Sequence, residues 1–126
     1  MTAFLTLDDI LGIHSEQIRQ FGGASGIRDP GLLESAVYRP LQKANYGVED
    51  IMELAAALLL GIAKNHPFID GNKRTAFTAA DVFLFLNGYS IEAEQEEIIA
   101  FVVAVAAGEI DEEGAVMFFR DFAVVI

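Results

Sequence analysis

Apolar residues recur along this chain at helical spacing, and two segments are apolar almost without interruption. These segments are 54–63 and 98–107, and each is bounded by charged residues or glycine. A bilayer requires about 20 apolar residues, so both segments are predicted to be buried helices of a folded core. The chain shows neither the alternation typical of strands nor an internal repeat. The pattern predicts an all-α fold, a compact single-domain bundle of about six helices over residues 1–126.

Capping residues set the predicted bounds of the first two helices. Thr6 and Asp9 have the hydroxyl–carboxylate spacing of a capping box, and the apolar stripe behind them ends at Gly22-Gly23. Asp29 and Pro30 are typical of an N-cap and a first helical residue, so a second helix begins there. The glycines between the two helices are interpreted as turn residues, because no lysine follows them as in a phosphate-binding loop.

Pro40 is predicted to end the second helix, because proline interrupts helical hydrogen bonding. Residues 39–48 then form the least regular part of the chain, and we interpret them as a connecting loop. The alternative is a flap beside the functional site that receives another polypeptide. His14, in the first helix, is interpreted as a surface or packing residue.

A central, buried helix is predicted to begin at residues 49–50 and to run to about Asn65. Pro67 cannot continue this helix, so His66 is expected just past its end. The later predicted elements are a helix from residue 71 or 72 to 87, a short extended piece at 91, a helix over 94–108, and a helix over 112–122 capped by residue 111.

The chain carries 8 basic and 19 acidic residues, a formal net charge of −11. Nucleic-acid binding requires a basic face, so no direct nucleic-acid binding is expected. Cysteine is absent, which excludes disulfides and thiolate chemistry. The first residues lack the basic region of a signal peptide, and no segment is long enough to enter a membrane. We therefore expect a cytoplasmic protein.

The polar stretch His66–Arg74 lies between two buried helices and combines several residue types that bind phosphate. The free N–H groups at the start of the following helix favour an anion, and Gly71 lets the backbone approach it closely. Lys73 and Arg74 add charge-assisted hydrogen bonds, and Asn72 can orient one oxygen. The stretch is thus predicted to bind phosphate groups.

Two further residues add chemistry to this stretch. Asp70 can hold Mg²⁺ that is already bound to substrate phosphates. His66 can act as a general base that takes the proton from an attacking hydroxyl. Phosphoryl transfer requires little more than positioning, charge stabilisation and such a base. Phe68 is assigned to structure, as an apolar anchor that holds the loop to the core.

Each polar residue of the stretch also has a purely structural interpretation. Asp70 can be the N-cap of the next helix, which is the commoner role for such a residue taken alone. Gly71 can be a turn residue and Asn72 an ordinary loop amide, while the two cations can be solvated surface charges. The convergence of these residue types within nine positions favours a functional site.

The stretch His66–Arg74 resembles the signature of the Fic/Doc family, and lysine at position 73 resembles its Doc (death-on-curing) toxin branch. Flanking residues are similar to that branch as well; they are Gly22-Gly23, Gly26–Gly31, Arg39-Pro40, Tyr46-Gly47 and Asn87-Gly88. The resemblance extends over about residues 7–122 and implies the helical Fic/Doc fold.

The resemblance implies a role for each residue of the signature. His66 would be the general base on a hydroxyl of a target protein, and Asp70 would coordinate Mg²⁺ on the nucleotide. Doc toxins are described as kinases that use ATP to phosphorylate a threonine of elongation factor Tu and so arrest translation. Their partner is the antitoxin Phd, whose C-terminal segment folds onto the toxin and blocks the site. The residues implied to cradle the phosphates are Gly71, Asn72, Lys73 and Arg74.

Two alternatives to a kinase stay open. Fic proteins of related sequence transfer AMP to a protein hydroxyl, and Pro67 and Gly71 resemble them. Lys73 stands where these members have glycine, and Phe77 stands where they commonly carry a second phosphate-binding arginine, so phosphate transfer is favoured. The third hypothesis is a non-catalytic binding module with a Fic-like fold.

Overall fold

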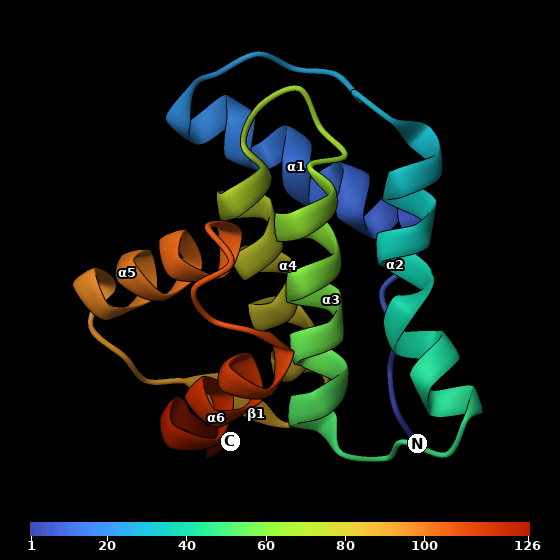
Figure 1. Ribbon diagram of the computed structural model, residues 1–126, viewed down its shortest axis with the longest axis vertical. Helices are drawn as coiled ribbons and strands as arrows, with labels where there is room; N and C mark the ends of the chain where they lie inside the picture. Colours follow the sequence, from blue (N-terminus) through green and yellow to red (C-terminus); the bar gives the residue numbers. More distant parts are fainter.

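The computed structural model describes residues 1–126 and contains six helices and two short strands. Helix α3 lies at the centre, with α2 on one side and α4 on the other, while α1 crosses one end of the bundle (Figure 1). The predicted all-α fold is confirmed. The elements are α1 (Leu7–Phe21), α2 (Pro30–Asn45), α3 (Ile51–Asn65), α4 (Asn72–Leu86), β1 (Tyr89–Ile91), α5 (Gln95–Ala106), α6 (Glu112–Phe122) and β2 (Ala123–Val125).

Helix α3 is buried along almost its whole length, as its apolar composition predicts. Every residue from Leu54 to Ala63 is buried, and one cluster of 25 buried apolar residues joins all six helices around α3. Gly61 allows α2 to approach closely, because a Cβ at this position would lie 3.0 Å from Cα of Ala36. None of the helices is both long and apolar enough to span a membrane.

The predicted helix starts are confirmed. Thr6 and Asp9 form a complete capping box at the start of α1. The carboxylate of Asp29 accepts a hydrogen bond from the main chain of α2, and the carboxylates of Asp50 and Asp111 do the same for α3 and α6. These caps depend on residues two to three positions apart, so the local sequence is sufficient to define them.

The prediction that Pro40 ends the second helix is wrong, because α2 continues to Asn45 with Pro40 inside it. Pro40 is buried, and its missing N–H removes only one helical hydrogen bond. Arg39 and Lys43 both pair with the Glu112 carboxylate of α6, at 2.7 and 2.8 Å. These contacts between helices stabilise the last turns of α2 against the effect of the proline.

The interpretation of residues 39–48 as a loop or flap beside the site is wrong for the same reason. Residues 39–45 are helical, and the connection that remains leads into the start of α3. The stretch with the signature follows the end of α3, so the two lie at opposite ends of a 15-residue helix about 22 Å long. The segment that contacts the signature is instead the one between α1 and α2 (Figure 1).

The short extended piece predicted at Ile91 is confirmed as strand β1, but its partner was not predicted. β1 pairs antiparallel with β2, in the register Tyr89–Val125, Ser90–Val124 and Ile91–Ala123. This two-stranded ribbon joins the end of α4 to the end of α6.

Asp81 of α4 is half-buried and forms no salt bridge. Burial raises the pKa of its carboxyl, so the folded protein binds this proton more tightly than the unfolded chain does. The ionised carboxyl therefore opposes folding at neutral pH, and its effect disappears as the pH falls through the raised pKa. We expect Asp81→Asn to raise the Tm at pH 7, with a gain that shrinks toward about pH 4 in thermal unfolding experiments.

Glu34→Gln is the matched control, since Glu34 is exposed on α2. A gain for Asp81→Asn of the same size at both pH values would show that the burial of charge is not its cause.

Candidate active site

The signature stretch lies where α3 ends and α4 begins. We call residues 66–71 the motif loop; it lies at the same end of the molecule as the segment between α1 and α2 (Figure 1). The two segments run antiparallel and share main-chain hydrogen bonds. Arg28 N–H donates to the Pro67 carbonyl at 2.7 Å, and Ile69 N–H donates to the Gly26 carbonyl at 3.1 Å. The motif loop is thus held from outside by a segment that lies about 40 residues earlier.

His66 is the C-cap of α3, as the sequence predicted, and its imidazole is exposed. With φ 48° and ψ 56°, it is the only non-glycine residue of positive φ. This left-handed conformation costs about 1–2 kcal/mol for a residue with a Cβ. The Arg28 guanidinium donates to the carbonyls of Asn65 and His66, from Nη2 at 2.8 Å and from Nε at 2.6 Å.

Phe68 anchors the motif loop in the core, and its side chain is 1% exposed. Its ring stacks on that of His14, with 3.7 Å between centroids and 4° between planes. The Asn72 side chain closes the loop around it: Oδ1 accepts from the Phe68 N–H and Nδ2 donates to the Phe68 carbonyl, both at 2.9 Å. The structure therefore supports the assignment of Phe68 to an anchoring role.

His14 belongs to the site as a structural residue. It is 4% exposed, and its Nε2 donates to the Asp70 carbonyl at 2.8 Å. Because a carbonyl can only accept, this nitrogen carries the proton. The sequence interpretation left packing as one option but missed the contact with the motif loop. A signal was present, since Ile10, His14 and Ile18 share one face of α1 at four-residue spacing.

Asp70 is held by main-chain donors on both carboxylate oxygens. Oδ2 accepts from Ala24 N–H at 3.2 Å, and Oδ1 accepts from Gly71 N–H at 2.8 Å. These two hydrogen bonds, the one from Ala24 first, lower the pKa of the carboxyl, and two nearby cations add to the effect. Gly23 must lack a side chain, because its φ is 117° and a Cβ would lie 2.6 Å from Oδ2 of Asp70.

The structural alternative for Asp70, a helix N-cap, is wrong. The N-cap of α4 is Gly71, and no side chain caps this helix. The first main-chain bond of α4 runs from Thr75 N–H to the Gly71 carbonyl, so the N–H groups of the preceding turn have no helical partner. An uncapped helix start with free donors is suited to a bound anion.

These free donors face an open cavity of about 430 Å³. The Arg74 guanidinium lies beside this cavity, and its Nη2 donates to the Gly22 carbonyl at 3.1 Å. The guanidinium carbon lies 5.5 Å from the centre of the Phe21 ring. Lys73 is exposed beside it and forms no hydrogen bond or salt bridge. The cavity, called the anion cavity below, is lined by Phe21, Gly22, Gly23, Asp70, Gly71, Asn72, Lys73 and Arg74.

The structure brings the residues predicted to bind phosphate around one cavity, but it separates two predicted roles. The amide of Asn72 is used within the loop and is 7% exposed, so its main-chain N–H is the group left for an anion. His66 does not line the anion cavity and lies at the other end of the motif loop. An acceptor hydroxyl would therefore have to approach between His66 and the cavity.

Asp70 is the only carboxylate that lines the anion cavity. No three carboxylate, histidine or cysteine side chains gather anywhere in the chain to enclose a metal ion. One ionised carboxylate with lone pairs to spare suits Mg²⁺ that is held mainly by phosphates and water. The residues present therefore fit a metal that arrives with its nucleotide.

An apolar groove continues from the anion cavity between α1, α4 and α5. It has a volume of about 350 Å³ and shares Phe21, Lys73 and Arg74 with the anion cavity. The residues that line this apolar groove are Gln17, Phe21, Lys73, Arg74, Phe77, Thr78, Gln95, Ile98, Ile99, Val102 and Val103.

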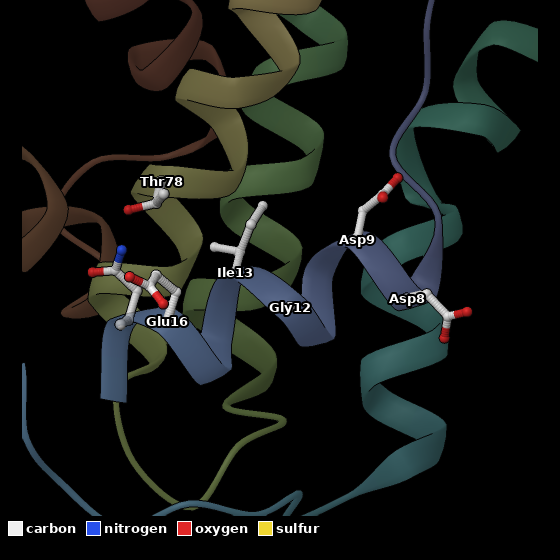
Figure 2. A pocket seen from close by; sticks show the side chains of 7 residues that line it. Asp8, Asp9, Gly12, Ile13, Glu16 and Thr78 are labelled. Carbon is white, nitrogen blue, oxygen red and sulfur yellow. The ribbon is translucent and has the colours of Figure 1, made fainter. Parts of the chain in front are cut away.

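A separate hollow of about 390 Å³ lies over α1 and is acidic (Figure 2). Its charged residues are Asp8, Asp9 and Glu16, which are spread along the helix rather than directed at one point. No basic residue lines this hollow, and only Glu16 pairs with a cation, Arg19, so its net negative charge repels phosphate and it is not an alternative phosphate site.

Fold and site together define a small helical protein in which an uncapped helix start borders a cavity and an exposed histidine ends the preceding helix. Residues 4–84 match the model of the Fic/DOC family. A protein named Toxin Doc from Mycolicibacterium smegmatis is 46% identical over 97 residues, which cover 75% of this chain and 72% of that protein. A protein named Protein kinase doc from Escherichia phage P1 is 34% identical over 104 residues, or 82% of each chain. The chain belongs to the Fic/DOC family.

The burial of Phe68 generates a stability prediction. Phe68→Ala should lower the free energy of unfolding by about 3–5 kcal/mol, because it leaves a cavity beneath the motif loop and removes the stacking partner of His14. Denaturant unfolding measures this change. Phe85→Ala on α4 is the matched control, because Phe85 is 62% exposed. Equal losses for the two variants would contradict the anchoring role.

Proposed function

We propose that this protein is a Doc-type toxin kinase, which transfers the γ-phosphate of ATP to a serine or threonine hydroxyl of a target protein. The observation that carries the proposal is the uncapped start of α4, where free N–H groups, Lys73 and Arg74 surround one cavity, with an exposed histidine at the other end of the motif loop. The similarity to a relative named as a protein kinase supports the same reaction.

Each residue has a defined part in this reaction. The N–H groups of residues 72–74 and the Arg74 guanidinium bind the phosphate oxygens, and Lys73 balances the charge that develops during transfer. His66 takes the proton of the acceptor hydroxyl, whose oxygen then bonds to the γ-phosphorus. The bond from this phosphorus to the bridging oxygen breaks, and ADP leaves. Asp70 would hold Mg²⁺, which supplies further neutralisation of phosphate charge when bound.

Arg74 is already oriented for this task. Its hydrogen bond to the Gly22 carbonyl and its contact with the Phe21 ring fix the guanidinium beside the helix start. A donor fixed in advance loses little freedom when phosphate binds, which is the condition for strong transition-state stabilisation.

The target and the inhibitor are proposed by resemblance to Doc toxins. The target is a translation factor, elongation factor Tu in the first instance, so that transfer arrests translation. The inhibitor is a Phd-like antitoxin segment in the apolar groove, where it would cover Lys73 and Arg74. An amphipathic segment with an apolar face and an acidic residue beside the two cations fits this groove.

A paired labelling experiment tests the reaction. A cell extract is incubated with the protein and Mg²⁺, and ATP is labelled either on the γ-phosphate or on the α-phosphate. We expect label on a protein only from γ-labelled ATP. Label from α-labelled ATP would instead establish AMP transfer and disprove the kinase proposal.

Two substitutions test the assigned roles in the same assay. His66→Ala should lower the transfer rate about 10²–10⁴-fold, the usual contribution of a general base. Arg74→Ala should lower it about 10²–10³-fold, as for one preorganised donor. Arg19→Ala is the control, because Arg19 is exposed and pairs only with Glu16 on its own helix. Growth arrest that persists in His66→Ala cells would favour the non-catalytic binding module.

A further inference from the structure

We propose that Arg28 is a positioning residue, whose guanidinium fixes the main chain of His66 and thereby the direction of the imidazole. The inference rests on the proposed function, in which His66 is the general base. Arg28 lies 38 residues before His66 and does not line the anion cavity. It would therefore act on the reaction only through His66.

The main-chain contacts of Arg28 cover three consecutive carbonyls. Nη2 donates to Asn65 at 2.8 Å, Nε donates to His66 at 2.6 Å, and the main-chain N–H donates to Pro67 at 2.7 Å. The first two carbonyls belong to the end of α3, where main-chain acceptors have no helical partner. The planar fork of a guanidinium can serve two such carbonyls at once.

These contacts determine the conformation of His66. The Asn65 carbonyl marks the peptide plane that precedes the His66 Cα, and the His66 carbonyl marks the plane that follows it. Rotation about the two bonds to the Cα, described by φ and ψ, sets the orientation of one plane relative to the other. A rigid guanidinium that holds both planes therefore restrains both angles. It holds them at φ 48° and ψ 56°, where a residue with a Cβ is disfavoured.

No hydrogen bond within the chain holds the imidazole directly, and the ring is exposed. The N–H of His66 donates to the Ile62 carbonyl at 3.3 Å, a long bond at the fraying end of a helix. The direction of the Cα–Cβ bond therefore depends on the main chain, and Arg28 supplies most of the contacts that hold it.

The test compares Arg28→Lys with Arg19→Lys, a matched control that keeps the charge and lies at an exposed site of α1. A lysine retains the cation but not the fork, so only one carbonyl can be held well. We expect Arg28→Lys to lower kcat roughly 10- to 100-fold, with the KM for ATP changed less than about twofold, because the general base is misplaced and the phosphate site is untouched. Arg19→Lys should leave both constants unchanged.

A double mutant separates positioning from a general structural effect. In the His66→Ala background no imidazole remains to be positioned, so Arg28→Lys should cause no further loss of transfer. An equal loss in both backgrounds, a rise confined to the KM for ATP, or wild-type kcat in Arg28→Lys would each overturn the inference.

Nuclear magnetic resonance provides a readout that does not depend on transfer. The main-chain and imidazole resonances of His66 should move in Arg28→Lys and stay in place in Arg19→Lys. If the wild-type protein transfers no γ-phosphate, the proposed function fails while this measurement still decides whether Arg28 holds His66. If Arg28→Lys does not fold, Arg28→Gln, which keeps one donor, is measured in its place, and unmoved His66 resonances there would overturn the inference.

Discussion

The packing of the buried Phe68 side chain connects the core to the candidate site. The motif loop has only six residues between two helices, and Pro67 and Phe68 are buried while His66, Ile69 and Asp70 are exposed. Because the Phe68 ring is stacked on His14, the main chain on either side of Phe68 leaves the core at a fixed position. His66 on one side and Asp70 on the other are thus presented at defined positions, although both are exposed. A loop without this anchor would have to order itself only when substrate bound, at a cost in entropy.

The anion cavity carries a local positive charge within an acidic protein. The chain has a net charge of −11, so long polyanions meet repulsion over most of the surface. Lys73, Arg74 and the start of α4 form a positive site that is confined to one cavity. Asp70 lies inside this site, but main-chain donors from Ala24 and Gly71 already satisfy its oxygens and keep it ionised. A small phosphorylated ligand that carries its own cation matches this arrangement better than a free polyphosphate chain does.

The sequence predicted the helix starts, which depend on hydrogen bonds between residues close together in the chain. The wrong or incomplete predictions concern contacts between residues far apart in the chain. Thr6, Asp29 and Asp111 identify helix starts because each bonds two to three positions along the chain. Past Pro40, α2 is contacted by Glu112 of another helix, which pairs with Arg39, and periodicity contains no such information. The contact of His14 with the Asp70 carbonyl spans 56 residues. Within the site, the signature placed the candidate residues in one stretch of sequence, whereas the bond from Ala24 that holds Asp70 required the fold.

The structure also shows that some residues of the signature stabilise the fold of the motif loop. Asn72 uses its amide to close the loop around Phe68, so this position is constrained by folding whether or not phosphate binds. Lys73 is different, because it is exposed and contacts no protein group through a hydrogen bond or salt bridge. No hydrogen bond or salt bridge within the folded chain requires this side chain, which borders the cavity. The Asn72 amide therefore serves the structure of the loop, whereas the Lys73 ammonium is left unpaired beside the cavity.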